Sequence, residues 1–187
     1  MSDIAIVYHS GYGHTAVVAE AVARGVGKVE GAKVTLIPVE QIDQHWDFLN
    51  DKAQAIIFGT PTYMGSASGQ FKTFMDASSK HWGKWRDKLA AGFTNSASQS
   101  GDKLATLIQL NIFAMQHHMV WVGLGLMPGN NNSKGSADDL NHLGSFLGAM
   151  AQSNADQGAD VAPAAGSQRT AEALGERVAN AALRWNK

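Results

Sequence analysis

Residues 4–15 read Ile-Ala-Ile-Val-Tyr-His-Ser-Gly-Tyr-Gly-His-Thr, and this stretch decides the fold class. The apolar run at its start predicts a buried strand, and the two glycines that follow predict a tight loop. From Thr15 onwards, apolar residues recur at the spacing of one helix face, namely Val17, Val18, Ala21, Val22 and Val26. A strand, a glycine loop and a helix in this order indicate the first half of a β–α–β unit.

The same alternation continues along the first 125 residues of the chain. Short apolar runs predict four more strands, at residues 33–39, 55–58, 89–93 and 119–124. Apolar residues at helical spacing predict helices over residues 68–79, 104–115 and 170–185, and a short crossover helix within 40–52. Five strands separated by helices favour a doubly wound α/β sheet with parallel strands.

Residues 125–169 differ from the rest because they contain few aliphatic side chains. Apart from one short helix expected near residues 138–143, they predict a long loop. Loops of this length inside a compact domain are usually functional.

Composition limits the function classes. The 187 residues suit a single domain spanning residues 1–187, and the net charge of −1 argues against a nucleic-acid-binding surface. The lack of cysteine excludes disulfides, thiolate metal sites and cysteine nucleophiles. No apolar run approaches the roughly 18 residues of a membrane span, and the first residues lack the basic flank of a signal peptide. We therefore expect a soluble, cytoplasmic protein.

Three loops follow predicted strands at residues 9–15, 59–65 and 94–101, where a doubly wound sheet binds its ligand. The first offers hydroxyls, glycines and a helix N-terminus without a lysine, which suits a terminal monophosphate. The second brings an aromatic ring and a thioether beside a proline, and the third is small and polar. Taken singly, the first loop is equally well explained as a helix cap, and the other two are better explained as ordinary turns. Their convergence favours a planar ligand that carries a phosphate.

Residues 10–15, 56–65 and 68–76 resemble the WrbA-type NAD(P)H:quinone oxidoreductases of the flavodoxin-like NADPH-dependent FMN reductase superfamily, and residues 88–90, 116–120 and 144–149 continue the match. This resemblance implies a flavodoxin-like three-layer α/β sandwich with five parallel strands in the order 2-1-3-4-5. It also implies an FMN-dependent oxidoreductase that passes reducing equivalents from NADH or NADPH to a quinone or similar small planar acceptor. Related enzymes assemble around their flavins, so we expect a homo-oligomer, either dimer or tetramer.

The resemblance also implies site residues by position. The FMN phosphate loop is matched by Ser10, Gly11, Tyr12, Gly13, His14 and Thr15. The two loops at the flavin ring are matched by Pro61, Thr62, Tyr63, Met64 and Gly65, and by Asn95, Ser96, Ala97, Ser98, Gln99 and Ser100.

Three further positions follow from the same resemblance. Tyr12 also matches a contact to the nicotinamide nucleotide, and Trp82 lies near an aromatic residue that walls the family's substrate pocket. His117 matches a histidine that reaches the flavin, and it is the one candidate for a catalytic role. The seven histidines show no metal-ligand spacing, so no metal site is expected.

Two other functions remain open at this point. A flavodoxin that carries single electrons has the same fold, although such carriers are usually markedly acidic for docking and this chain is not. A flavin-free interaction module is the second alternative, because a fold does not determine a function.

Overall fold

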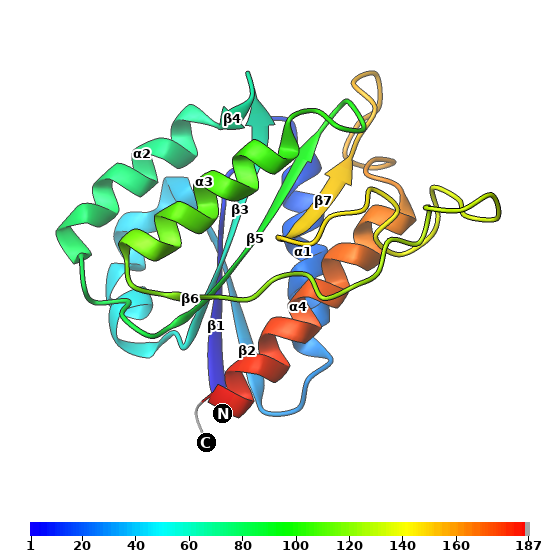
Figure 1. The fold of residues 1–187 in the computed structure, drawn as a ribbon. Coiled ribbons are helices and arrows are strands. Elements are labelled where there is room, and N and C mark those ends of the chain that lie inside the picture. The colour runs from blue at the N-terminus through cyan, green and yellow to red at the C-terminus, as the bar shows by residue number, and fades with distance from the viewer. Residues whose placement is uncertain (186–187) are drawn as a thin grey trace.

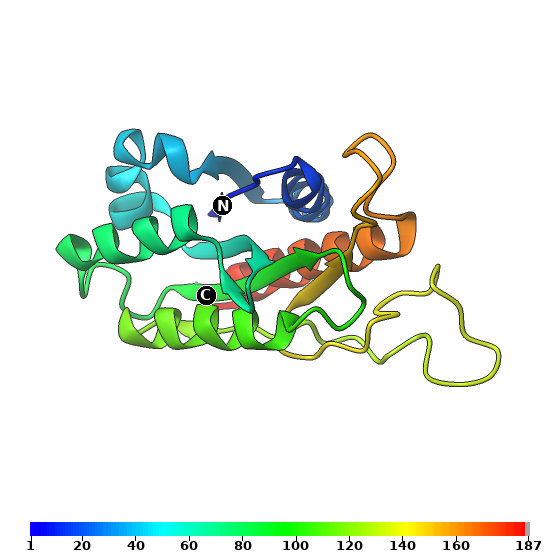
Figure 2. The same ribbon diagram turned by 90° about the horizontal axis from the view of Figure 1, so that it is seen from above.

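The computed structural model describes residues 1–185 as three layers, with one sheet between two layers of helices (Figures 1 and 2). The parallel path of the sheet runs in the order β2-β1-β3-β5-β6. These strands are β1 (Ser2–Tyr8), β2 (Ala32–Pro38), β3 (Ala55–Tyr63), β5 (Leu89–Ser96) and β6 (Val120–Trp121). The flavodoxin-like order predicted from the sequence is confirmed. The numbers differ only because a short strand, β4 (Ser66–Ala67), pairs antiparallel with the end of β3.

The helices divide into two pairs. Helices α1 (His14–Gly27) and α4 (Ala165–Trp185) pack against each other on one face of the sheet. The other face is covered by α2 (Gly69–Ala77) and α3 (Lys103–Gln116). The predicted crossover within 40–52 forms two short turns of irregular helix, η1 (Val39–Gln44) and η2 (Phe48–Lys52), and a third, η3 (Ser78–His81), follows α2.

Strand periodicity places the core on both faces of the sheet. Along β1, Ile4 and Ile6 belong to the apolar cluster with α1 and α4, whereas Ala5 and Val7 belong to the cluster with α2 and α3. Successive residues of a strand point to opposite faces, so a strand covered on both sides is apolar throughout. Helices α1 and α4 can approach each other closely because Gly25 and Gly175 have no side chain at the contact. A Cβ on either glycine would overlap the backbone of the other helix.

The fifth strand is interrupted, which the sequence did not indicate. Strand β6 pairs with the start of β5 at Leu89 and Ala90, and β7 (Ala149–Gln152) pairs with its end at residues 93–96. The predicted strand at 119–124 therefore ends at Trp121, and residues 122–148 leave the sheet before the chain returns to it. The expected helix near 138–143 is wrong, because these residues form turns in which the Asn141 amide binds the carbonyls of Leu126 and Ser145.

None of the helices in residues 1–185 is long and apolar enough to cross a membrane.

Candidate functional site

A cavity of about 620 Å³ lies at the carboxyl ends of β1, β3 and β5. All three predicted loops contribute to its wall, and so does a fourth segment. The lining residues are Tyr12, His14, Thr15, Pro61, Thr62, Tyr63, Asn95, Ser96, Ala97, Ser153, Ala155, Gln157 and Gly158. The remaining predicted ligand residues belong to the same loops but do not line the cavity: Ser10, Gly11, Gly13, Met64, Gly65, Ser98, Gln99 and Ser100.

The first loop ends at the N-terminus of α1, where unpaired N–H groups and the helix dipole favour an anion. Gly13 allows the turn into the helix because it adopts a left-handed φ of 88°. The Ser10 hydroxyl accepts a hydrogen bond from the backbone N–H of Ala16 at 3.0 Å, so Ser10 caps the helix. Thr15 is only 2 % exposed and lines the cavity, and its hydroxyl has no hydrogen-bond partner elsewhere in residues 1–185. Thr15 is therefore free to bind a ligand oxygen.

The second loop is the end of β3 and the turn after it. The Tyr63 ring lies over Gly11, where an added Cβ would come within 2.6 Å of the phenol oxygen. It also packs edge to face on Tyr12, with ring centroids 6.2 Å apart. Burial raises the pKa of Tyr63, so its phenol remains protonated at neutral pH. Beneath the loop, the Thr62 hydroxyl lies 2.8 Å from those of Thr94 and Thr106, which fixes β3 against β5 and α3.

In the third loop the backbone carbonyls are bound by the protein, whereas the backbone N–H groups are left free within residues 1–185. Five successive carbonyls, those of residues 96–100, accept hydrogen bonds from other parts of the protein. The backbone N–H groups of residues 97–102, by contrast, donate to no other residue in the described part of the chain. The loop therefore offers donors for a ligand.

The fourth segment, residues 153–158, was missed in the sequence analysis. The Ser153 hydroxyl donates to Asn95 Oδ1 at 2.9 Å, and His14 Nε2 lies 2.8 Å from the carbonyl oxygen of Gln157. These bonds join the segment to the first and third loops. Its signal was present as Asn154-Ala-Asp-Gln-Gly158, but the preceding strand, Ala149–Gln152, is short and lacks β-branched residues. Without that strand, nothing placed the loop at the same edge of the sheet.

The lining of the cavity contains no lysine, arginine, aspartate or glutamate. A phosphate there would be bound by neutral hydroxyl and N–H donors at the helix N-terminus, and a planar group would lie against Tyr63 and the third loop. No three histidine, cysteine, aspartate or glutamate side chains within residues 1–185 gather as a metal site.

Comparisons with known proteins decide the family. The family described as NADPH-dependent FMN reductase matches residues 44–133. The chain is 45 % identical to the flavodoxin FldP of Pseudomonas aeruginosa over 185 residues, which cover 96 % of both chains. It is 36 % identical to an NAD(P)H dehydrogenase (quinone) of Geobacter sulfurreducens, over 65 % of this chain and 71 % of that one.

A solved structure agrees with these matches. The WrbA-like flavodoxin of Agrobacterium tumefaciens aligns with a TM-score of 0.75 and 42 % identity, over 98 % of this chain and 99 % of that one. The chain belongs to the flavodoxin-like FMN reductase superfamily. The resemblance to WrbA-type proteins is thereby confirmed, and the superfamily is one of FMN-binding oxidoreductases.

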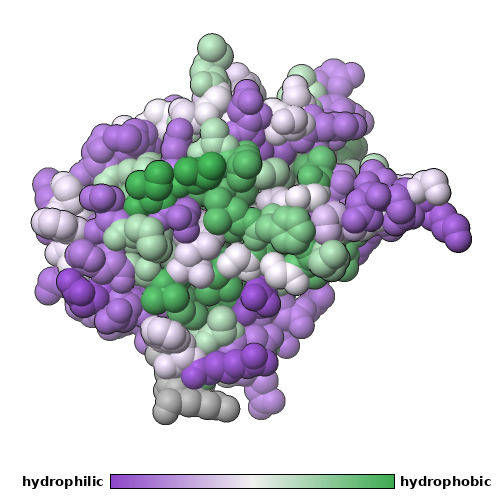
Figure 3. All heavy atoms as spheres, in the orientation of Figure 1, coloured by the Kyte–Doolittle hydropathy of each residue, from purple (hydrophilic) through white to green (hydrophobic). Residues whose placement is uncertain are grey.

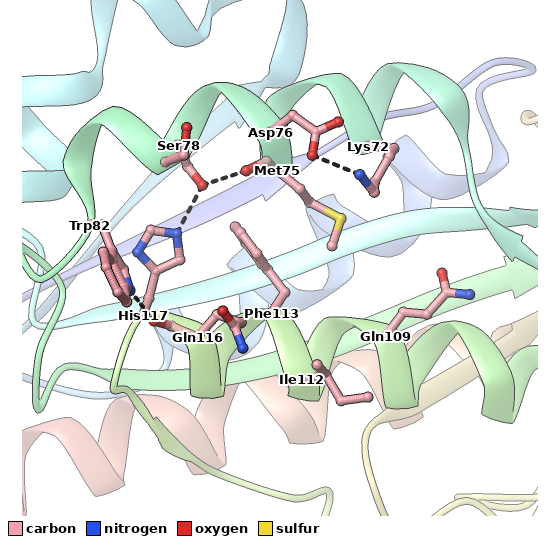
Figure 4. A pocket seen from close by; sticks show the side chains of 11 residues that line it. Lys72, Met75, Asp76, Ser78, Trp82, Gln109, Ile112, Phe113, Gln116 and His117 are labelled. Carbon is pink, nitrogen blue, oxygen red and sulfur yellow. Dashed lines mark hydrogen bonds and ion pairs between the residues drawn. The ribbon is translucent and has the colours of Figure 1, made fainter.

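Two of the site residues that the resemblance implies, Trp82 and His117, lie outside this cavity. Trp82 and His117 line a second hollow, of about 750 Å³, between α2 and α3 (Figure 4). This groove opens near the amino ends of the strands, because η3 and the end of α3 lead back to the starts of β5 and β6. Within one chain, therefore, neither residue lines the cavity formed by the loops, and the contact of His117 with the flavin stays a prediction.

His117 is integrated into the aromatic core beside this groove. Its Nε2 lies 2.8 Å from the Ser78 hydroxyl, and its ring packs on Trp85 with centroids 4.1 Å apart. Burial lowers the pKa of His117 to about 4, with a smaller contribution from His118 and His81. The ring is therefore neutral at physiological pH. Trp82, in contrast, is 67 % exposed and donates from Nε1 to the carbonyl of Gln116.

One arrangement superficially resembles a hydrolase triad. His9 Nδ1 lies 2.8 Å from the Ser68 hydroxyl, and His9 Nε2 lies 3.7 Å from a carboxylate oxygen of Glu40. Ser68, however, is buried and caps α2 by accepting from the N–H of Phe71. A substrate cannot reach this hydroxyl, so the group stabilises the fold rather than acting as a nucleophile.

Proposed function

We propose that the chain binds FMN in the cavity at the carboxyl ends of the strands and passes reducing equivalents from NADH or NADPH to a quinone or a similar small planar acceptor. The observation that carries this proposal is the convergence of four loops on one uncharged cavity that begins at the N-terminus of α1. The phosphate would bind at Ser10 to Thr15, and the ring would bind against Tyr63 and residues 95–100.

Bound FMN supplies the redox chemistry, since its ring accepts a hydride and returns the electrons to an acceptor. The protein supplies binding and orientation. The free N–H groups of residues 97–102 can stabilise negative charge gained by the ring on reduction. Tyr12 is exposed at the mouth of the cavity, where a nicotinamide or acceptor ring can stack on it.

The direct test is anaerobic mixing of FMN-loaded protein with NADH or NADPH, followed by addition of a quinone. The proposal expects loss of the oxidised-flavin absorbance without any other protein present, and its recovery when the quinone is added. Flavin that stays oxidised until a separate reductase is supplied would overturn the enzyme assignment.

A one-electron carrier is the second candidate, because the relative that is 45 % identical is named a flavodoxin. Against it stands the net charge of −1, with 15 basic and 16 acidic residues, which gives no strongly acidic docking surface. The same mixing experiment separates the two candidates, since a carrier needs its reductase.

We further propose that the protein is a cytoplasmic homo-oligomer that associates through the face of α3. Four apolar residues on one side of this helix are exposed: Leu104, Ile108, Ile112 and Met115. Figure 3 shows apolar side chains gathered on the face of the molecule that α3 covers. In such an assembly the groove of one copy, with the exposed Trp82 and the buried His117 in its wall, would face the flavin cavity of another, as the superfamily resemblance implies.

Light scattering tests this association. We expect a mass of two or four times 19.9 kDa at micromolar concentration, and Ile112→Glu should reduce it towards one chain. A wild-type particle of one chain mass would contradict the proposal.

A further inference from the structure

Lys103 is a lysine with no exposed surface, at the first position of α3 directly after the third loop. Its ammonium nitrogen contacts three oxygens of that loop: the Ser96 hydroxyl at 2.8 Å, the Ser98 carbonyl at 2.7 Å and the Gln99 carbonyl at 2.8 Å. All three donors of the ammonium group are therefore used, and no carboxylate pairs with it among the described residues. A buried, unpaired charge is costly, so its position needs a reason.

The contacts of Lys103 determine which way the loop backbone faces. Because the carbonyls of Ser98 and Gln99 point at the ammonium group, the peptide N–H groups that follow them point away from it. The neighbouring carbonyls of Ser96 and Ala97 are held by the Ser153 N–H and the Gln152 amide. A Cβ on Gly101 would overlap the Ser96 side chain, so the loop closes tightly around the ammonium group.

The charge is also isolated. The cavity lining holds no Lys, Arg, Asp or Glu, and its Ser96 contacts the ammonium nitrogen directly. Burial lowers the pKa of Lys103 to about 8, so the charged form prevails at neutral pH. A ring that gains negative charge in the cavity would thus face free N–H donors with one buried cation behind them.

We propose that Lys103 is a positioning residue for the flavin site: it turns the carbonyls of the third loop inward, directs the loop's N–H groups outward, and favours the reduced, more negative ring over the oxidised one. This inference rests on the proposed FMN function. The directed N–H donors and the cation behind them both stabilise negative charge on the ring, so loss of Lys103 should weaken the binding of reduced FMN more than that of oxidised FMN.

The test compares Lys103→Met with Lys88→Met. Lys88 is a half-buried lysine, bound by the carbonyls of Leu49 and Asn50 at the opposite end of β5. The dissociation constant of oxidised FMN is measured by flavin fluorescence, and the midpoint potential of bound FMN is measured against redox dyes. We expect Lys103→Met to weaken oxidised FMN about tenfold and reduced FMN about a hundredfold. The tenfold difference between them lowers the two-electron potential by about 30 mV.

Lys88→Met should leave both quantities unchanged. Equal potentials and affinities in Lys103→Met and wild type would overturn the inference, and a lowered affinity with an unchanged potential would overturn the preference of the site for the reduced ring. If Lys103→Met does not fold, Lys103→Gln replaces it, because the amide keeps two donors without the charge. Wild-type protein that binds no FMN would instead overturn the proposed function. The loop component is then decided by hydrogen exchange at residues 97–102, which should be faster in Lys103→Met than in Lys88→Met.

Discussion

A lysine bound by backbone carbonyls lies at each end of β5, but the two lysines hold different kinds of structure. At each end a lysine is withdrawn from water, its pKa is lowered to about 8 by burial, and its ammonium nitrogen is bound by backbone carbonyls. At the amino end, Lys88 holds η2, whose Asn50 also accepts a hydrogen bond from Trp85 of the aromatic core. At the carboxyl end, Lys103 fixes an exposed loop whose N–H groups have no partner within residues 1–185.

This difference indicates that the amino end of β5 belongs to the structural scaffold and the carboxyl end to the ligand site. The amino end is filled with rings that pack on one another, so its polar groups serve the fold. The carboxyl end leaves hydrogen-bond donors unused around an uncharged cavity, at the edge where parallel α/β sheets bind ligands. Substitutions at the amino end should therefore change stability, and substitutions at the carboxyl end should change ligand affinity.

The largest loss of stability is expected for Trp85→Ala at the amino end of β5. Trp85 is fully buried, packs on Phe58 and Phe113, and donates to Asn50 Oδ1 at 3.0 Å. Its truncation leaves a cavity and an unpaired amide, so the free energy of unfolding in urea should fall by about 3–5 kcal/mol. Trp82→Ala, at an exposed ring nearby, is the control and should change it by less than about 1 kcal/mol. If both variants lost the same unfolding free energy, Trp85 would not differ from Trp82 as a core residue.

The second effect is the acid sensitivity of the amino end. The pKa of His117 is about 4 in the folded chain and near 6.5 when unfolded, so between these values the unfolded chain binds more protons. Stability should therefore fall by about 3 kcal/mol as the pH falls from 6.5 to 4. Urea unfolding of wild type and His117→Gln across this range isolates the contribution. Burial also lowers the pKa of His142, and that contribution remains in both proteins. Parallel pH curves for the two proteins would contradict this account of His117.

The sequence predicted one end of the molecule better than the other. The loops after β1, β3 and β5 were found because each follows a recognisable apolar strand, and parallel strands bring their carboxyl ends together. The segment at 153–158 was missed because β7 has only four residues and the position beside β5 had already been assigned to residues 119–124. The position of His117 could not be predicted, since a histidine after a helix gives no indication of whether it faces the core or a ligand.

At the carboxyl end, Thr15→Ala should weaken FMN binding about tenfold to a hundredfold, because it removes a hydrogen bond to a charged phosphate worth roughly 1.5–3 kcal/mol. The unfolding free energy without FMN should change little, since the Thr15 hydroxyl has no partner in the described chain. Thr15→Ser keeps the hydroxyl and should retain most of the affinity in a fluorescence titration. Unchanged affinity in the folded alanine variant would exclude Thr15 as a phosphate ligand.

The smallest effect, and the one that refines the comparison, is that of Ser10→Ala. The Ser10 hydroxyl already accepts from the Ala16 N–H, so its loss should cost about 1 kcal/mol of stability as a helix cap. Its loss of FMN affinity should be smaller than that of Thr15→Ala. The reverse ranking in parallel titrations would mean that Ser10, rather than Thr15, dominates phosphate binding.

Amide hydrogen exchange with and without FMN tests most directly where the ligand binds. If the account is correct, FMN slows exchange in the four segments of the carboxyl-end cavity, residues 10–16, 61–65, 96–102 and 153–158. The largest change is expected at residues 97–102, because their N–H groups have no partner in the described chain before the ligand binds. Unchanged exchange in these four segments under saturating FMN, with slowing confined to other parts of the chain, would contradict it.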